Sequence, residues 1–592
     1  MSIRFNIQFN NVNTVWASVL AETLARLGLK TAVICPGSRS AALAVAFAQN
    51  PGIEAVPVLD ERSAAFWALG LARQGRSAVL VCTSGSAGAH FYPAVIEAYE
   101  SRMPLLILTA DRPPELRDCN AGQTVDQQKL YGSFSSFYSE LALPALDRLP
   151  YLRQTLIHAW ERLHYPVGSV VHLNLPFRDP LAPVSQPDVE QFAAQFPADF
   201  FEAIAPAAWP AVALNPAIAP IQPPSERGLI IAGLAQPDAP QAYSTAVARL
   251  AEALQVPVLA EGLSPLRNYA DLNPSLISTY DLMLRDPELA DKLAPDWVIR
   301  LGEMPTSKQL RQWLSQIQPR QWIIESTDRN LDPLHGKTTH LRGSVEQFAQ
   351  QFTQQFAQPD NWPVAPLSPY LDLWLTQEAK YRAALDQQLA TLPAQPQLFE
   401  GKAAWILSQY LPEHTPLYVA SSTPTRDVEF FWRPGNRAIR PYFNRGANGI
   451  DGTLSTALGM AHRNQSSVLL TGDLALLHDT NGFLIGRRLV GHLTIVLINN
   501  QGGGIFESLP IAAFDPPFEE FFATPQSINF AQLCQTYGVE YELIGSWDQL
   551  IQQISVLPAQ GLRLLELQTD RKQDAQTRRM LLTSAVLPNN QP

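Results

Sequence analysis

The sequence predicts an α/β protein made of three doubly wound domains, each built on a parallel sheet. Short apolar runs alternate with longer stretches of helical periodicity, an order typical of parallel sheets covered by helices. The 592 residues exceed what a single hydrophobic core usually serves. Hydrophobic residues make up 46% of the chain and charged residues 16%, a globular and not a disordered composition. Functional residues are expected at the carboxyl ends of the strands, where such sheets bind ligands.

The first domain is expected over residues 1–185. Its strands are predicted from apolar runs that each end in a turn, at residues 32–35, 56–59, 78–82 and 104–108. Asp60 precedes a stretch with helical spacing, so we predict that it caps the N-terminus of that helix. Residues 186–225 are rich in proline and alanine without clear periodicity, and this composition predicts a linker.

The second domain is expected over residues 226–355 and the third over residues 356–592. The second begins with the apolar run at residues 227–235 and continues with alternating helix and strand patterns. A proline-containing stretch near residues 355–370 indicates the next boundary, after which a third α/β pattern runs to the end of the sequence. Three α/β units of this kind amount to a coarse repetition of one architecture.

Charge and cysteine content narrow the classes of function. The net charge of −11 argues against a general nucleic-acid or membrane-surface binder. An anionic substrate would therefore need a local cluster of basic side chains. The four cysteines are scattered without a CxxC pair, which predicts neither a zinc site nor a disulfide framework and favours a reducing cytoplasm. The N-terminal segment is polar, so we expect no signal peptide, and no apolar run reaches the roughly 18 residues of a membrane span.

Two polar segments each follow an apolar strand pattern in the third domain. The first is Thr471-Gly472-Asp473, and the second is Asn499-Asn500, which continues into the glycine-rich run 501–504. Mg²⁺ prefers oxygen ligands and often takes only one or two from side chains, with phosphate oxygens and water completing its shell. Glycines let the backbone approach phosphates closely. Together the segments predict a Mg²⁺-diphosphate site, whereas each one alone is also compatible with an ordinary turn.

These segments resemble the motif of thiamine-diphosphate-dependent enzymes, which reads GDG followed further along by NN. Leu474 stands where the motif has its second glycine, but Asp473 is unchanged. The resemblance implies the thiamine-diphosphate-binding fold, with pyrimidine, central and diphosphate domains in that order. It also implies that Asp473, Asn500 and the carbonyl of Gly502 hold Mg²⁺, with Mn²⁺ as an alternative, and that Gly472 lies beside the cofactor.

The same family implies a glutamate at the end of an early strand, and Glu61 stands there. Such a carboxyl shares a proton with the aminopyrimidine ring and promotes the tautomer that deprotonates the thiazolium. The resulting ylid attacks a 2-oxo group and stores the electrons released by decarboxylation. Burial would favour proton sharing by raising the pKa of the carboxyl. The alternative is a first-turn glutamate stabilised by the helix dipole.

Further segments resemble one branch of this family, at residues 35–40, 60–63, 109–119, 444–459 and 498–510. Enzymes of that branch decarboxylate 2-oxoglutarate and add the succinyl carbanion equivalent to isochorismate, in menaquinone and phylloquinone biosynthesis. Both substrates are dianions, so several cations are needed, and Arg is suited to bidentate carboxylate binding. The resemblance implies these substrate-binding residues: Ser38, Arg39, Arg112, Gln123, Lys308, Ser422, Arg426 and Arg445. An arginine in a loop, taken alone, is more often a solvated surface charge.

Several apolar residues are implied to shape the site. Ile450 resembles the wedge that bends the cofactor, and Ile505, Phe506 and Leu509 resemble walls beside the cofactor and isochorismate. Plain core packing is the alternative for all of them. The family also implies a homodimer or homotetramer with active sites at the subunit interface.

Two other functions stay open. Another thiamine-diphosphate enzyme acting on a 2-oxo acid, such as an acetolactate synthase or a decarboxylase, would need to bind only one carboxylate. A non-catalytic nucleotide-binding protein is disfavoured because no GxGxxG pattern follows a predicted strand.

Overall fold

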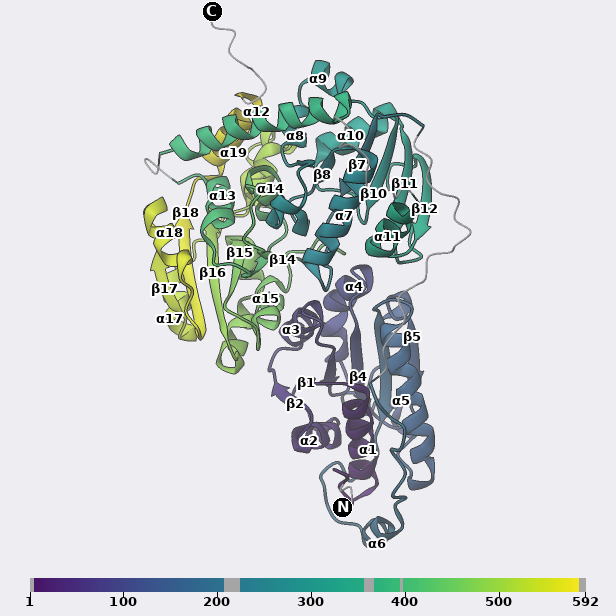
Figure 1. Cartoon of the computed structure of the whole chain (residues 1–592). Helices are drawn as coiled ribbons and strands as arrows, with labels where there is room; N and C mark the ends of the chain where they lie inside the picture. The colour runs from purple at the N-terminus through teal and green to yellow at the C-terminus, as the bar shows by residue number, and fades with distance from the viewer. Residues whose placement is uncertain (1–4, 207–223, 356–366, 394–397, 585–592) are drawn as a thin grey trace, which may run out of the picture. The chain divides into compact units, whose positions relative to one another are not determined.

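The computed structural model describes residues 5–206, 224–355, 367–393 and 398–584. Helices and strands alternate along the chain, and the strands form three six-stranded sheets with parallel neighbours (Figure 1). The predicted α/β fold class is therefore confirmed. The chain divides into two compact units: unit 1 comprises Met1–Trp209, Asn444–Asn464 and His478–Gly491, and unit 2 comprises Pro210–Phe443, Gln465–Leu477 and His492–Pro592.

The first sheet lies in unit 1, with strand order β2-β1-β3-β4-β6-β5. Its strands are β1 (Thr31–Ile34), β2 (Glu54–Pro57), β3 (Ala78–Cys82), β4 (Leu105–Asp111), β5 (Phe137–Glu140) and β6 (Val170–Pro176). The helices of this unit are α1 (Val12–Leu27), α2 (Ala41–Gln49), α3 (Glu61–Arg73), α4 (Tyr92–Glu100), α5 (Leu149–His164), α6 (Pro187–Phe192) and α15 (Thr453–Ala461). Side chains of α1, α2 and α5 form one hydrophobic core with the sheet.

Helix α3 begins as predicted, because the Asp60 side chain accepts a hydrogen bond from the backbone N–H of Arg62 at 2.9 Å. The helix is buried along most of its length and packs against α15 through glycines. A Cβ on Gly70 would lie 2.1 Å from the carbonyl oxygen of Thr456. One on Gly459 would lie 2.1 Å from that of Trp67. Both positions therefore need glycine for the backbones to approach.

The second sheet lies in unit 2, with strand order β12-β11-β10-β7-β8-β9. Its strands are β7 (Gly228–Ala232), β8 (Val258–Ala260), β9 (Leu276–Ile277), β10 (Trp297–Leu301), β11 (Arg320–Glu325) and β12 (Lys337–Arg342). The associated helices are α7 (Pro240–Leu254), α8 (Tyr280–Met283), α9 (Pro287–Lys292), α10 (Lys308–Ile317), α11 (Val345–Gln355) and α12 (Pro369–Thr391). This order has the topology of a dinucleotide-binding sheet, although the glycine fingerprint of that fold does not follow its first strand.

The third sheet, also in unit 2, has strand order β14-β13-β15-β16-β18-β17. Its strands are β13 (Pro416–Val419), β14 (Arg440–Tyr442), β15 (Ser467–Gly472), β16 (His492–Asn499), β17 (Glu540–Leu543) and β18 (Gly561–Gln568). Its helices are α13 (Glu400–Tyr410), α14 (Thr423–Phe431), α16 (Asp473–His478), α17 (Phe530–Tyr537), α18 (Trp547–Ser555) and α19 (Arg571–Ser584). The first and third sheets share one topology, in which the order reverses beside the first strand of each. Ligands bind at such reversal points.

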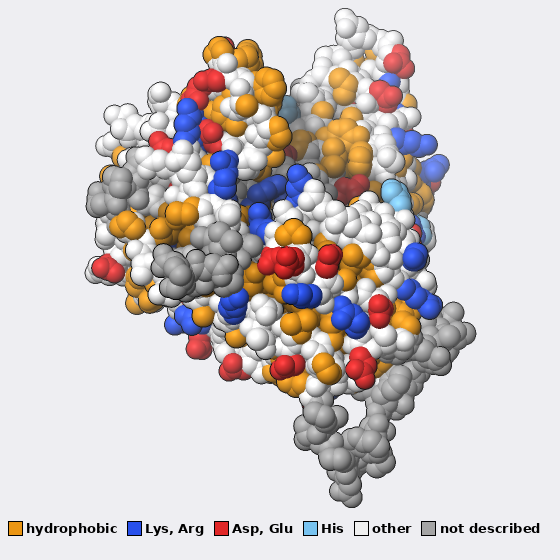
Figure 2. Space-filling model, turned by 90° about the horizontal axis from the view of Figure 1, so that it is seen from above, with side chains coloured by type: hydrophobic (Ala, Val, Ile, Leu, Met, Phe, Trp, Pro, Cys, Tyr) orange, Lys and Arg blue, Asp and Glu red, His pale blue; other side chains and the backbone are white. Residues whose placement is uncertain are grey.

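Parts of two predicted boundaries lie outside the described residues, namely residues 207–223 of the linker and residues 356–366. None of the described helices is both long and apolar enough to cross a membrane. On the face shown in Figure 2, Lys and Arg side chains are interspersed with Asp and Glu.

Candidate functional site

Asp473 and Asn500 follow neighbouring strands of the third sheet. Strands β15 and β16 pair in parallel, with Gly472 opposite Ile498, so both residues lie at the same carboxyl edge. Asp473 is 3% exposed and Asn500 is 6% exposed. One carboxylate oxygen of Asp473 accepts a hydrogen bond from the backbone N–H of Gly502 at 2.8 Å. The fold thus brings together the two segments that carry the predicted metal ligands.

Burial raises the pKa of the Asp473 carboxyl to about 6, although backbone N–H donors of Leu474 and Gly502 act in the opposite direction. A buried carboxylate is costly to ionise unless a positive charge lies beside it. A divalent cation would supply that charge.

The Asn500 amide is bonded on one side only. Its Nδ2 donates to Oε2 of Glu400 at 2.9 Å, whereas its Oδ1 is buried and has no hydrogen-bond partner among the described residues. An unsatisfied buried polar atom typically costs about 1–3 kcal/mol, so such an atom in a native fold calls for a ligand. The free oxygen fits a metal ion that prefers oxygen ligands.

The glycine-rich turn leaves no room for side chains. Gly502 has φ of +136°, and a Cβ on it would lie 2.3 Å from the carbonyl oxygen of Ala523. A Cβ on Gly503 would lie 2.5 Å from that of Phe522. The described residues contain no cluster of three or more His, Cys, Asp or Glu side chains suited to a metal. One carboxylate, one amide oxygen and one backbone carbonyl nevertheless suit Mg²⁺ bound to a diphosphate.

Ser422 and Arg426 lie beyond the end of β13, which neighbours β15 at the reversal point of the sheet. Ser422 has φ of 75° and ψ of −134°, a backbone conformation that only glycine adopts without strain. The Arg426 guanidinium donates to the carbonyl oxygen of Ser422 at 2.8 Å. The turn therefore places a cation and a strained serine at the same edge of the sheet as Asp473.

The apolar residues after the glycine-rich turn differ in their surroundings. Phe506 packs edge-on against Phe522, with ring centroids 5.8 Å apart, so core packing accounts for part of its contact. Leu509 is 45% exposed and Ile505 is half-buried. Leu509 is thus not a core residue of the described chain.

Lys308 is the first residue of α10 and is exposed. Among the described residues its ammonium has no ion-pair partner, and no described contact links it to the other candidates.

Glu61 is the first residue of α3 in unit 1 and is half-buried. Burial, and after it the charges of nearby groups that include Glu61, raise the pKa of the Cys35 and Cys82 thiols well above the ordinary value. Cys35 directly follows β1, and Cys82 is the last residue of β3. Glu61 therefore lies near the carboxyl ends of these two strands. Its position in the first turn agrees equally with a dipole-stabilised residue.

Ile450 precedes α15 and is half-buried. Its carbonyl oxygen accepts a hydrogen bond from Thr453 at 2.7 Å, at the start of the helix. A Cβ on the neighbouring Gly452 would lie 1.9 Å from the ring of Phe66, so this segment packs closely on α3 within unit 1.

Two arginines approach each other at the carboxyl edge of the first sheet. Arg39 follows β1 and donates to the carbonyl oxygen of Phe177 at 2.9 Å. Burial and the neighbouring charge of Arg112 both lower the pKa of Arg39. Arg112 follows β4 and donates to the hydroxyl of Ser84 and to the carbonyl of Gln123, the latter at 3.1 Å. Two neighbouring positive charges at the carboxyl edge of a parallel sheet are suited to binding an anion.

Ser38 is exposed on the loop that carries Arg39, and Gln123 is exposed with a positive φ of 59°. The Gln123 side chain donates to the carbonyl of Ser84 at 3.1 Å. The first sheet thus collects Ser38, Gln123 and both arginines at one edge.

Arg445 lies in unit 1, on a loop whose backbone is hydrogen-bonded to a buried glutamate. The carboxylate of Glu97 accepts the backbone N–H groups of Gly446 at 3.0 Å and Ala447 at 2.6 Å. Glu97 is in turn paired with Arg73 at 2.9 Å in a buried ion pair. The backbone on the C-terminal side of Arg445 is therefore fixed.

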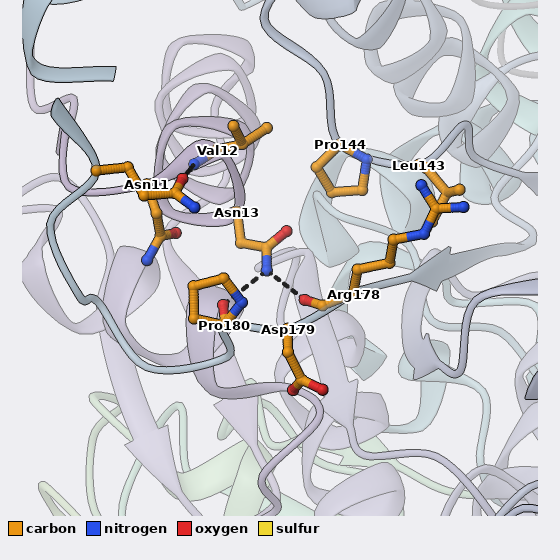
Figure 3. Close-up of a pocket in the computed structure, with 9 residues that line it drawn as sticks. Asn11, Val12, Asn13, Leu143, Pro144, Arg178, Asp179 and Pro180 are labelled. Atoms are coloured by element: carbon orange, nitrogen blue, oxygen red, sulfur yellow. Dashed lines mark hydrogen bonds between the residues drawn. The ribbon is translucent and has the colours of Figure 1, made fainter. Parts of the chain in front are cut away.

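Unit 1 also holds a cavity of about 150 Å³, lined in part by Arg178 and Asp179 (Figure 3). The Asn13 amide on its wall donates to the carbonyl oxygens of Arg178 and Pro180, at 2.8 and 2.9 Å. None of the candidate residues lines it, so it is not part of the candidate site.

Comparisons with known proteins show which family the chain belongs to. Residues 15–130 match the family described as thiamine pyrophosphate enzyme, N-terminal TPP binding domain, and residues 221–419 match the one described as middle domain of thiamine pyrophosphate. The 2-succinyl-5-enolpyruvyl-6-hydroxy-3-cyclohexene-1-carboxylate synthase (SEPHCHC synthase) of Nostoc sp. is 60% identical over 590 residues, 98% of this chain and 99% of the relative. This chain belongs to the SEPHCHC synthase family.

Other SEPHCHC synthases are similar over the same extent. Those of Trichodesmium erythraeum and Acaryochloris marina are 56% and 55% identical, covering 97% and 98% of this chain and 98% and 99% of the relatives. A solved structure from Mycobacterium smegmatis, described as thiamin diphosphate-dependent, superposes with a TM-score of 0.65 at 18% identity, covering 94% of this chain and 99% of that one. It shows a shared fold. The predicted resemblance to thiamine-diphosphate enzymes, and to this branch of them, is confirmed.

Sequence reasoning missed three residues that hold members of the candidate site in place. Ser84 bonds both Arg112 and Gln123, and Glu400 bonds Asn500. Arg571 donates to the carbonyl of Gln501 at 3.1 Å and to Glu507 at 2.9 Å, holding the segment after the glycine-rich turn. Each contact joins segments distant in sequence, and no local pattern signals it.

Proposed function

We propose that this chain catalyses the thiamine-diphosphate-dependent decarboxylation of 2-oxoglutarate and the addition of the succinyl unit to isochorismate, with release of CO₂, in menaquinone or phylloquinone biosynthesis. The observation that carries this proposal is the carboxyl edge of the third sheet. There the buried Asp473 carboxylate and the unbonded Asn500 oxygen lie on neighbouring strands, in a chain 60% identical to a SEPHCHC synthase.

The proposed metal site consists of Asp473, Asn500 and the carbonyl of Gly502. These groups would hold Mg²⁺, or Mn²⁺ as an alternative, against the diphosphate, with Gly472 beside it. Bound thiamine diphosphate supplies the electron sink that decarboxylation requires. Support comes from the raised pKa of Asp473 and the free amide oxygen of Asn500.

Glu61 is the proposed catalytic residue, holding a proton at the pyrimidine ring nitrogen of the cofactor. Ile450 and Ile505 are proposed to pack against the cofactor rings. Support for Glu61 comes from its place at the carboxyl edge of the first sheet and from its partial burial.

The proposed substrate ligands are mainly cations, because both substrates carry two carboxylates. Arginine pairs with a carboxylate through two parallel hydrogen bonds. The side chains proposed to bind the carboxylates are Arg39, Arg112, Lys308, Arg426 and Arg445. Ser38, Gln123 and Ser422 would add neutral hydrogen bonds, and Phe506 and Leu509 apolar walls. The proximity of Arg39 and Arg112 supports this assignment most directly.

The proposed assembly is a homodimer or homotetramer in the cytoplasm. Glu61 and Asp473 belong to different units of the chain, and we propose that the Glu61 unit of one subunit faces the Asp473 unit of another. Closed two-fold symmetry is the commonest arrangement of homo-oligomers. The scattered cysteines support a reducing compartment.

An assay with purified enzyme tests the function. Product should form from 2-oxoglutarate and isochorismate only when thiamine diphosphate and Mg²⁺ are both present. Pyruvate should be a poor donor because it lacks the distal carboxylate. Efficient use of pyruvate, or indifference to isochorismate, would instead favour an acetolactate-synthase-like enzyme or a simple decarboxylase.

A further inference from the structure

Glu400, the first residue of α13, lies behind the proposed metal ligand Asn500. Its side chain is 2% exposed, and its Oε2 accepts the Asn500 amide nitrogen at 2.9 Å. Burial raises the pKa of Asp473, hydrogen bonds from backbone N–H groups lower it, and the charge of Glu400 raises it further. Glu400 is therefore close to the Asp473 carboxyl as well. Glu400 is not among the site residues that the family resemblance implies.

The contact decides which end of the amide faces the metal position. A carboxylate can only accept hydrogen bonds, so the NH₂ end of Asn500 must point at Glu400. The carbonyl end then points the other way, and its oxygen is buried with no partner in the described part of the chain. An amide NH₂ is only a donor, so Asn500 could not bind a cation if it were turned round.

The Glu400 carboxylate is itself held in place. Its Oε1 accepts from Arg578 at 2.5 Å, and the same guanidinium donates to Asp427 at 2.8 Å. The backbone N–H of Glu400 donates to Asp574 at 3.1 Å. The paired arginine fixes the face that Glu400 presents to Asn500.

Gly504 lies beside the Asn500 side-chain amide and leaves space for it. A Cβ on this residue would lie 2.6 Å from the Asn500 amide nitrogen. The absence of a side chain there leaves the space that the amide occupies when it donates to Glu400.

We propose that Glu400 is a positioning residue that orients the Asn500 amide so that its oxygen, and not its nitrogen, faces the divalent cation. This inference rests on the metal site proposed above. Groups that orient metal ligands typically contribute about 10- to 100-fold to metal affinity. Glu400→Gln should therefore weaken Mg²⁺ binding by about that factor, because a glutamine amide can donate to the Asn500 oxygen and stabilise the reversed amide.

The test is calorimetric titration of Mg²⁺ into the full-length protein with thiamine diphosphate present. Asp427→Asn is the matched control, since it changes a buried carboxyl that pairs with the same arginine but does not contact Asn500. The control should keep a Mg²⁺ affinity close to that of the wild type. Melting temperatures without cofactor report separately on the fold of each variant.

A second background separates orientation from structural support. In Asn500→Asp both side-chain ends are oxygens, so orientation no longer matters and Glu400 faces a like charge. Adding Glu400→Gln there should strengthen Mg²⁺ binding, because the glutamine removes the repulsion and donates a hydrogen bond. A merely structural role of Glu400 predicts weaker binding in both backgrounds.

The inference is overturned if Glu400→Gln binds Mg²⁺ like the wild type, or if its effect has the same sign in both backgrounds. Should Glu400→Gln fail to fold, Gly504→Ala displaces the same amide and must weaken Mg²⁺ binding, and a wild-type affinity would overturn the inference equally. Asp473→Ala distinguishes the two levels of proposal. If Asp473→Ala loses Mg²⁺ binding, the proposed metal site is supported whatever the result for Glu400. If Asp473→Ala still binds Mg²⁺, both the metal site and the role of Glu400 are contradicted.

Discussion

Arg426 shows how a single side chain ties the fold to substrate choice. Its guanidinium is anchored on the Ser422 carbonyl at the reversal point of the third sheet. Truncating one partner of a buried charge pair typically costs about 2–5 kcal/mol, or about 30-fold to several thousand-fold at roughly 1.4 kcal/mol per tenfold. We expect Arg426→Ala to lower kcat/KM for a dianionic substrate within that range, measured by steady-state kinetics.

The control for Arg426 is Arg433→Ala, which removes a half-exposed arginine just beyond the same helix. Its kcat/KM should stay at the wild-type value, and thiamine diphosphate affinity should be unchanged in both variants. Equal losses from the two variants would mean that only overall charge matters.

Ser422 is a second test at this scale. Its positive φ costs about 1–3 kcal/mol, a strain that recurs at functional sites. We expect Ser422→Gly to raise the melting temperature of the cofactor-free protein, because glycine adopts this conformation freely. It should also lower kcat/KM, because the proposed substrate hydrogen bond is lost. A lower melting temperature with unchanged kinetics would mean that the serine is retained for stability.

At the scale of elements, Asp479 connects α3, which begins with Glu61, to α15, which follows Ile450. Its carboxylate accepts from the backbone N–H of Ser455 at 2.7 Å, and from the hydroxyl of Ser63 on α3 at 3.4 Å. Burial raises the pKa of Asp479 from 3.8 to about 6. A carboxyl with a raised pKa in the fold stabilises it most below the unfolded pKa, and that contribution is lost as pH rises through the folded pKa.

The expected outcome is a pH-dependent effect of Asp479→Asn. As pH rises from about 4 to about 7, the wild type loses stability that the variant, having no proton to lose, retains, so the difference in melting temperature should shift in favour of the variant. Scanning calorimetry of the cofactor-free proteins across this range measures it. A difference independent of pH would contradict the burial of an ionisable Asp479.

The elements that the sequence predicted well are those that local sequence patterns determine. Strands β15 and β16 follow from their apolar runs, and the placement of Asp473 and Asn500 at strand ends follows with them. The Asp60 cap follows from one residue before a helical pattern.

Other features depend on tertiary packing and leave no local trace. Glu400 and Asn500 are 100 positions apart, and the backbone of Ser422 departs from what its residue type favours. The approach of Arg39 to Arg112 requires strand orders that hydrophobic periodicity does not specify.

At the scale of the molecule, the first and third sheets repeat one topology, and each bears part of the proposed site at its reversal point. Glu61 lies with one sheet and Asp473 with the other, in separate units. A cofactor with a pyrimidine end and a diphosphate end matches two such edges. The central claim is that one edge comes from each of two subunits.

Subunit complementation tests that claim most directly. Glu61→Gln and Asp473→Ala chains with different tags are co-expressed, and the mixed oligomer is purified by both tags. If sites form between subunits, one of the two sites in each mixed dimer combines an intact Glu61 with an intact Asp473, so about half of the wild-type activity per dimer is expected. Each single-variant oligomer should be nearly inactive. A mixed dimer as inactive as its parents would show that each site is built within one chain, and would contradict the account.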